Sequence, residues 1–153
     1  MDEDSATTFG RTIGALFHGV HEGFRAQVRD LDREALNWRP VPGANSIAVL
    51  INHTVGSERE MIRAVRALAT ERDREAEFMV EADADQLLAQ LDRADSEMDE
   101  HLAALTAADL TALRPRGDRP PRLGIDWLIS NYGHEREHLA QVELTKQLYD
   151  NRR

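Results

Sequence analysis

The apolar residues of this chain recur every three or four positions through four long segments, and no run alternates apolar and polar residues between turn signals. This spacing places apolar side chains on one face of a helix and argues against strands. We predict an all-α fold in which residues 1–153 form a single domain, a four-helix bundle. The predicted helices are Ser5 to about Arg29, Ile47 to about Thr70, Asp83 to about Leu105 and Ile125 to Tyr149.

Three predicted connections separate these helices. Residues 36–46 contain two prolines and one glycine, which end a helix and favour an ordered connection. Residues 71–82 are acidic, with a small hydrophobic anchor around Phe78. Residues 114–122 form the most basic stretch of the chain, which we interpret as a loop.

Composition and charge exclude several classes of function. Cysteine is absent, so a disulfide, a thiolate metal ligand and a cysteine nucleophile are excluded. The net charge of −9 disfavours contact with nucleic acid, because phosphate groups are repelled. The longest apolar run, Ile47 to Ile51, is far shorter than the roughly 20 residues of a membrane span, and the acidic start differs from an export signal. We expect a cytoplasmic protein without a nucleic-acid or membrane partner.

His134 and His138 are one helical turn apart on the predicted inward face of the last helix. Their side chains leave the helix on the same side and are close enough to bind one metal ion. His53 lies on the inward flank of the second helix, and helices that alternate in direction would place it within one turn of the level of His134. A divalent ion held by these three imidazoles, zinc or nickel by preference, would keep positions open for a water molecule or substrate. The alternative is that they are core histidines with hydrogen-bond partners.

Other polar residues also fall on inward faces. Glu58 is expected to accept a hydrogen bond from an imidazole or to pair with a basic group, and Asn131 either lies beside the metal ligands or is a buried amide. His21 and His101 are expected near the same level as further polar pocket residues, although a hydrogen-bonded core role is the alternative. The loop of residues 114–122 is expected either to receive a carboxylate of a ligand or to be a solvated turn.

A di-iron carboxylate site was considered, because residues Glu135 to His138 form a Glu-x-x-His element. Such a site needs a second element of this kind. His101 is preceded at the required spacing by Met98, so the second element is missing. The sequence therefore favours a single-metal site.

Two stretches of the chain carry a resemblance to a known family. One is Leu-Asn-Trp-Arg-Pro-Val-Pro-Gly-Ala-Asn-Ser-Ile-Ala at residues 36–48, followed by His53 and Glu58; the other is His-Glu-Arg-Glu-His at residues 134–138, followed by residues 139–142. With these motifs the chain resembles the DinB-like superfamily, which includes bacillithiol- and mycothiol-dependent transferases. The resemblance implies a four-helix bundle, a homodimer and one divalent metal ion bound by His53, His134 and His138.

The resemblance also implies a class of reaction. Some relatives use the metal to activate a low-molecular-weight thiol, of the mycothiol or bacillithiol type, for attack on a small electrophile. The expectation is therefore a metal-dependent thiol transferase with a small-molecule substrate. A metal-dependent hydrolase or isomerase, and a non-catalytic, stress-associated protein that binds a small molecule or metal, are the alternatives. No catalytic side chain beyond the metal site is assigned.

Overall fold

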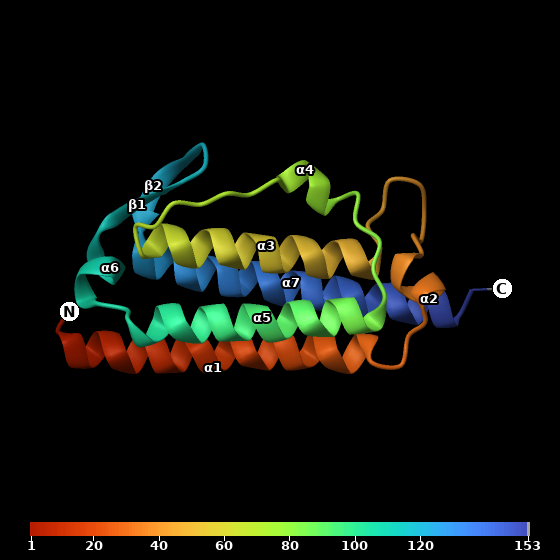
Figure 1. The fold of residues 1–153 in the computed structure, drawn as a ribbon, viewed down its shortest axis with the longest axis horizontal. Coiled ribbons are helices and arrows are strands. Elements are labelled where there is room, and N and C mark those ends of the chain that lie inside the picture. The colour runs from red at the N-terminus through yellow and green to blue at the C-terminus, as the bar shows by residue number, and fades with distance from the viewer. Residues whose placement is uncertain (153) are drawn as a thin grey trace.

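The computed structural model describes residues 1–152, in which four long helices pack side by side and shorter elements connect them (Figure 1). The elements, in chain order, are α1 (Glu3–Val28), α2 (Arg33–Asn37), α3 (Ile47–Val65), α4 (Arg74–Glu77), α5 (Ala84–Ala103), α6 (Ala107–Thr111), β1 (Leu113–Arg116), β2 (Arg119–Leu123) and α7 (Gly124–Asp150). The predicted all-α class is confirmed, apart from one small two-stranded sheet. No helix in the described part of the chain combines the length and the apolar character needed to cross a bilayer.

The starts of the helices follow the capping signals of the sequence. The Ser46 hydroxyl accepts a hydrogen bond from the backbone N–H of Val49 at the start of α3. Asp83 and Gln86 form a reciprocal capping box at the start of α5. These caps satisfy backbone donors that the first turn of a helix leaves without partners.

The prediction that the second helix continues to about Thr70 is wrong, because α3 ends at Val65. Ala67 adopts a left-handed conformation with a φ of 55°. The backbone N–H of Leu68 then donates to the carbonyl of Arg63 at 2.8 Å, which closes the end of the helix. The apolar residues at 67–69 continue the helical pattern in sequence, but the backbone has already turned.

The long helices do not alternate in direction, which was the condition assumed when the levels of His53 and His134 were compared. Figure 1 shows that α1 and α7 run one way, whereas α3 and α5 both run the other way. The side chain of Asn52, near the start of α3, accepts from Gln90, near the start of α5, at 2.8 Å. Lys146, near the end of α7, donates to the carbonyl of Gln27, near the end of α1, at 3.0 Å. Residues 66–83, with α4, run back along the bundle and make the parallel pairing of α3 and α5 possible.

Strands β1 and β2 form an antiparallel hairpin where we expected a loop. Gly117, with a φ of 54°, lies in its turn. Neither strand shows the alternation of apolar and polar residues that predicts a strand, since arginine and proline predominate in both. The indole of Trp127, in the first turn of α7, donates to the carbonyl of Arg114 at 2.8 Å and fastens the hairpin to the bundle.

The hydrophobic core consists of two clusters along the bundle axis. One cluster includes Phe24, Ile51 and Leu91, and the other includes Phe17 and Met61. Buried polar residues lie between the clusters on the long helices and are described below. The bundle therefore has a polar layer near its middle.

Candidate metal centre

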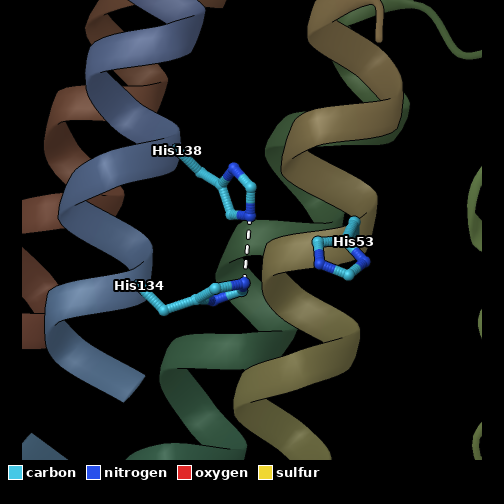
Figure 2. Close-up of side chains that lie close together, drawn as sticks. All are labelled: His53, His134 and His138. Atoms are coloured by element: carbon cyan, nitrogen blue, oxygen red, sulfur yellow. Dashed lines mark hydrogen bonds between the residues drawn. The ribbon is translucent and has the colours of Figure 1, made fainter. Parts of the chain in front are cut away.

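Three histidine side chains converge between α3 and α7, as predicted from their spacing (Figure 2). The ring centroid of His53 is 5.4 Å from that of His134 and 5.2 Å from that of His138. The rings of His134 and His138 are 4.3 Å apart. Each residue offers one ring nitrogen, and these nitrogens lie within 4.8 Å of one another. Bonds of about 2.0–2.1 Å from nitrogen to a divalent ion are within reach of small side-chain adjustments.

His53 and His134 lie at similar levels along the bundle, although α3 and α7 run in opposite directions. His53 is 12 residues before the end of α3, and His134 is 10 residues after the start of α7. At 1.5 Å per residue these positions are about 18 Å and about 15 Å from the shared end of the bundle. His53 is about 9 Å from the start of α3 and about 18 Å from its end, so its level falls within about one turn of that of His134 for either direction of the helix.

Hydrogen bonds orient two of the three imidazoles. His53 Nδ1 lies 3.0 Å from Glu77 Oε2, and His138 Nδ1 lies 2.8 Å from Gln141 Oε1. Both oxygens are acceptors and so favour the tautomer with its proton on Nδ1 and the Nε2 lone pair free; at His53 the carboxylate oxygen is closer than the Arg72 Nη2 donor, which lies 3.3 Å from the same Nδ1. His138 Nε2 is 3.0 Å from His134 Nε2. A donor set of imidazole lone pairs pointing at one another fits a divalent metal ion.

The site favours the neutral, metal-binding form of His134 and His53. Burial lowers the pKa of His134 to about 3, and the nearby rings of His138 and His53 add to this effect. Burial also lowers the pKa of His53, although the hydrogen bond to Glu77 acts in the opposite direction. His134 Nδ1 is buried and has no hydrogen-bond partner among residues 1–152. Protons therefore compete weakly with a metal ion at His134 and His53.

The outer side of His53 is covered by α4 and the connection before it. The ring of Phe78 lies 5.0 Å from the His53 ring. Arg72 holds Glu77 through bonds of 2.6 Å from Nε and 2.7 Å from Nη2, and it also donates to Glu60 at 3.1 Å. Glu77 and Arg72 were not predicted as site residues, since residues 71–82 have little apolar pattern beyond the anchor at Phe78. The one available signal was that Glu77 directly precedes this anchor.

A second polar cluster lies in the middle of the bundle and takes one residue from each long helix. His21 Nε2 is 2.7 Å from Glu58 Oε2, and His21 Nδ1 is 2.6 Å from Asp95 Oδ1. Glu135 Oε2 is 3.7 Å from His21 Nε2. We call His21, Glu58, Asp95 and Glu135 the central polar layer. His21, Glu58 and Glu135 also offer ligand atoms within 4.8 Å of one another.

The charges of the central polar layer compensate one another. Burial lowers the pKa of His21, but the hydrogen bonds with Asp95 and Glu58 outweigh burial and raise this pKa to about 9. Burial, together with the neighbouring charge of Glu58, raises the pKa of Glu135 well above its usual value. A cationic His21 between two carboxylates balances the buried charges, and the raised pKa of Glu135 favours its uncharged form, but Glu135 Oε2 has no hydrogen-bond partner among residues 1–152.

The remaining sequence-based candidates lie outside the three-histidine cluster. Glu58 contacts the imidazole of His21, which is not one of the three. Asn131 donates to Glu135 Oε1 at 2.9 Å and accepts from the Ser57 hydroxyl at 3.0 Å. His101 is partly exposed on α5, 3.7 Å from Glu97. The structure therefore places Glu58, Asn131 and His21 in or beside the central polar layer.

A cavity of about 620 Å³ opens beside His134. It is lined by Ser57, Arg116, Arg119, Pro120, Arg122, Trp127, Ser130, Asn131 and His134. We call it the hairpin pocket, because β1 and β2 contribute its arginines. A larger groove of about 780 Å³ follows α3 and α5, but none of the three histidines lines it. The hairpin pocket therefore connects most directly with the candidate metal centre.

Comparisons with known proteins agree with the fold. A conserved protein from Enterococcus faecalis has a crystal structure that matches with a TM-score of 0.77 and 17% identity, covering 93% of this chain and 97% of the other. A DinB-like protein from Bacillus cereus ATCC 10987 matches with a TM-score of 0.71 and 18% identity, covering 86% of each chain. No curated protein sequence matches this chain significantly. The family model of the DinB superfamily matches residues 16–142, which is most of the sequence, and the chain therefore belongs to this superfamily.

Proposed function

We propose that this protein binds one divalent metal ion through His53, His134 and His138 and uses it to transfer a low-molecular-weight thiol to a small electrophile. The observation that carries the proposal is the convergence of three imidazole nitrogens in a buried to half-buried site. No fourth protein ligand belongs to this group among the described residues, so positions on the ion remain open for a reactant.

Two further observations favour a thiol substrate. The chain contains no cysteine, so a thiolate reaction has to use a thiol supplied from outside. The hairpin pocket gives a small molecule access to His134 from one side. A bound thiol and a second small reactant can thus meet at the three histidines.

Each residue of the site has a distinct part in the proposed reaction. His53, His134 and His138 hold the metal, and Glu77 keeps the His53 ring in its orientation. A divalent ion at these nitrogens supplies Lewis acidity, which lowers the pKa of a thiol that it contacts. The sulfur forms a bond to the electrophilic carbon, the thiol proton passes to solvent, and the leaving group departs with its electron pair.

The first test is elemental analysis of protein purified without an affinity tag. We expect about one divalent ion per chain in the wild type and its loss in His53→Ala and His138→Ala. His18→Ala is the matched control, since His18 is partly exposed on α1 and pairs with Asp99 at 2.7 Å. A wild-type protein that stays metal-free after incubation with zinc, nickel and manganese would overturn the proposal.

The second test separates the proposed reaction from two alternatives. Thiols are screened with alkyl halide and epoxide electrophiles, using metal-loaded wild type and His134→Ala. A thiol transferase gives a product that contains the thiol and loses turnover in the variant, whereas its fold is retained. Turnover without added thiol would indicate a hydrolase or an isomerase. Ligand binding that persists after metal removal, without turnover, would indicate a binding protein.

A further inference from the structure

The hairpin pocket carries positive charge that the rest of the chain does not neutralise. Arg116 is buried and compensated, since its Nε donates to Glu60 Oε2 at 2.9 Å and its Nη2 donates to Ser57 Oγ at 2.7 Å. Arg119 and Arg122, by contrast, form no ion pair with a carboxylate among residues 1–152. The whole chain has a net charge of −9, so these two guanidinium groups make the pocket a locally basic site on an acidic chain.

The arginines of the pocket are arranged around an aromatic side chain. The guanidinium carbon of Arg122 lies 5.2 Å from the centre of the Trp127 ring, and that of Arg116 lies 5.5 Å from it. Trp127 is held in turn by its hydrogen bond to the carbonyl of Arg114. These contacts restrict the side chains before a ligand arrives, which reduces the entropy lost on binding.

The two sides of the pocket differ in chemistry. Its arginines come from the β1–β2 hairpin, whereas His134 contributes to its wall from α7. Trp127 and Pro120 add apolar surface, and Ser57, Ser130 and Asn131 add polar atoms. A ligand can therefore place an anionic group at the hairpin while another part of it reaches the three histidines. The volume of about 620 Å³ falls in the usual range for small-molecule sites.

We propose that Arg119 and Arg122 bind the anionic group of the small-molecule substrate, a carboxylate or phosphate attached to a flat apolar body. This inference rests on the proposed function, because it assigns the substrate class of the same site. Guanidinium groups bind both anions through paired N–H donors, and the apolar body lies against Pro120 on the pocket wall. Arg116 has a different role, since its donors already hold Glu60 and Ser57 and fasten β1 to α3.

The test measures binding rather than turnover. Phenylacetate, phenyl phosphate and neutral phenylacetamide are titrated calorimetrically into the wild type, the double variant Arg119→Gln/Arg122→Gln, and the control Arg29→Gln/Arg136→Gln. The control removes two exposed arginines outside the pocket, so the change in net charge is the same. We expect the wild type to bind one or both anions at least about tenfold more tightly than the amide, and the pocket variant to lose this preference. The control stays within about twofold of the wild type.

A fluorescence titration locates the bound probe. The chain has two tryptophans, so a Trp38→Phe background leaves Trp127 as the reporter of the pocket. We expect the anion to change Trp127 emission with the same dissociation constant that calorimetry gives. Calorimetric binding without any change in this emission would place the anion elsewhere and overturn the proposal.

The two proposals can fail independently. All titrations are made on metal-loaded and on chelator-treated protein, with metal content measured on the same samples. Arginine-dependent anion binding to metal-free protein supports the pocket even if the protein takes up no metal. Anion binding that needs the metal and is unchanged in Arg119→Gln/Arg122→Gln would overturn the assignment of these arginines as the anion site. The proposed metal site would not be affected by that result. Equal affinity of the wild type for the anions and the amide also overturns it.

Discussion

Glu77 Oε2 lies 3.0 Å from Nδ1 of His53, although the two residues are 24 positions apart and belong to different helices. The contact connects the short helix α4 with the candidate metal centre. A carboxylate that accepts from the outer nitrogen of a ligating imidazole fixes the tautomer and strengthens the inner nitrogen as a donor. The connection between α3 and α5 therefore contributes to the site as well as joining two parallel helices.

Glu77→Gln should weaken metal binding without unfolding the protein. The substitution keeps the shape of the side chain but removes the charge that holds the proton on His53 Nδ1. We expect metal affinity to fall by about tenfold, within the roughly 10–100-fold range for such partners. Competition with a chromophoric chelator measures the affinity. Glu75→Gln, on the exposed side of the same short helix, is the control, and equal affinities in the two variants would contradict the assigned role of Glu77.

Two charge-removing substitutions in the central polar layer should lower the free energy of unfolding by different amounts. Burial and the neighbouring Glu58 raise the pKa of Glu135 well above its usual value, which favours the uncharged form, and Glu135→Gln should lower the free energy of unfolding by about 1 kcal/mol or less. Asp95 accepts hydrogen bonds from both His21 and Arg25, so Asp95→Asn leaves two cations short of a partner. We expect Asp95→Asn to cost about 3–5 kcal/mol. Urea unfolding at pH 7 measures both costs, and the reverse order would show that Glu135 is the ionised member.

The sequence predicts the long helices well because their signals are local. Apolar spacing, the Ser46 cap and the capping box at Asp83 act over a few residues and need no knowledge of the partner helices. Helix direction is different, since it depends on residues 66–83 running back along the bundle. The length of a connection does not reveal its path. The hairpin was missed for a related reason, because Trp127 holds β1 in place without any alternation in the strand.

The three histidines were predictable because two are one helical turn apart and the level of the third matches theirs within about one turn for either direction of α3. Their outer contacts were not predictable in the same way. Glu77 approaches His53 through a short helix that folds over α3, and nothing in its local sequence indicates that partner. His21 was placed near the site by level alone, but its imidazole meets Glu58 and Asp95 in the central polar layer. The height of a residue along the bundle axis therefore restricts where its side chain can lie, but it does not determine which residues the side chain contacts.

His21 should make the stability of the protein depend on pH. Hydrogen bonds with Asp95 and Glu58 overcome the effect of burial and raise its pKa from 6.5 to about 9. A raised pKa in the folded state stabilises the fold fully below pH 6.5, and this contribution is lost as the pH rises through 9. The contribution is on the order of 3 kcal/mol. Unfolding free energies of the wild type and His21→Gln, measured from pH 6 to 9.5, should therefore converge with rising pH, and a constant difference would contradict the assigned charge.

Gly124 and Gly133 are both in α7, yet alanine should have opposite effects at the two positions. A Cβ on Gly124 would overlap with the backbone carbonyl of Asp109, which cannot move without shifting α6. A Cβ on Gly133 would meet no atom within 4 Å. We expect Gly124→Ala to lower the unfolding free energy by about 1–3 kcal/mol. Gly133→Ala should raise the free energy of unfolding by about 0.5–1 kcal/mol, because alanine favours the helix.

The same two substitutions should differ in their effect on metal binding. Gly124 is the first residue of α7, so a displaced helix start would move His134 relative to His53. Gly124→Ala should therefore weaken metal binding as well as stability, whereas Gly133→Ala should leave metal affinity unchanged. Thermal unfolding and chelator competition on the same two variants measure both effects, and unchanged metal affinity in a destabilised Gly124→Ala protein would show that the contact with α6 does not position the metal centre.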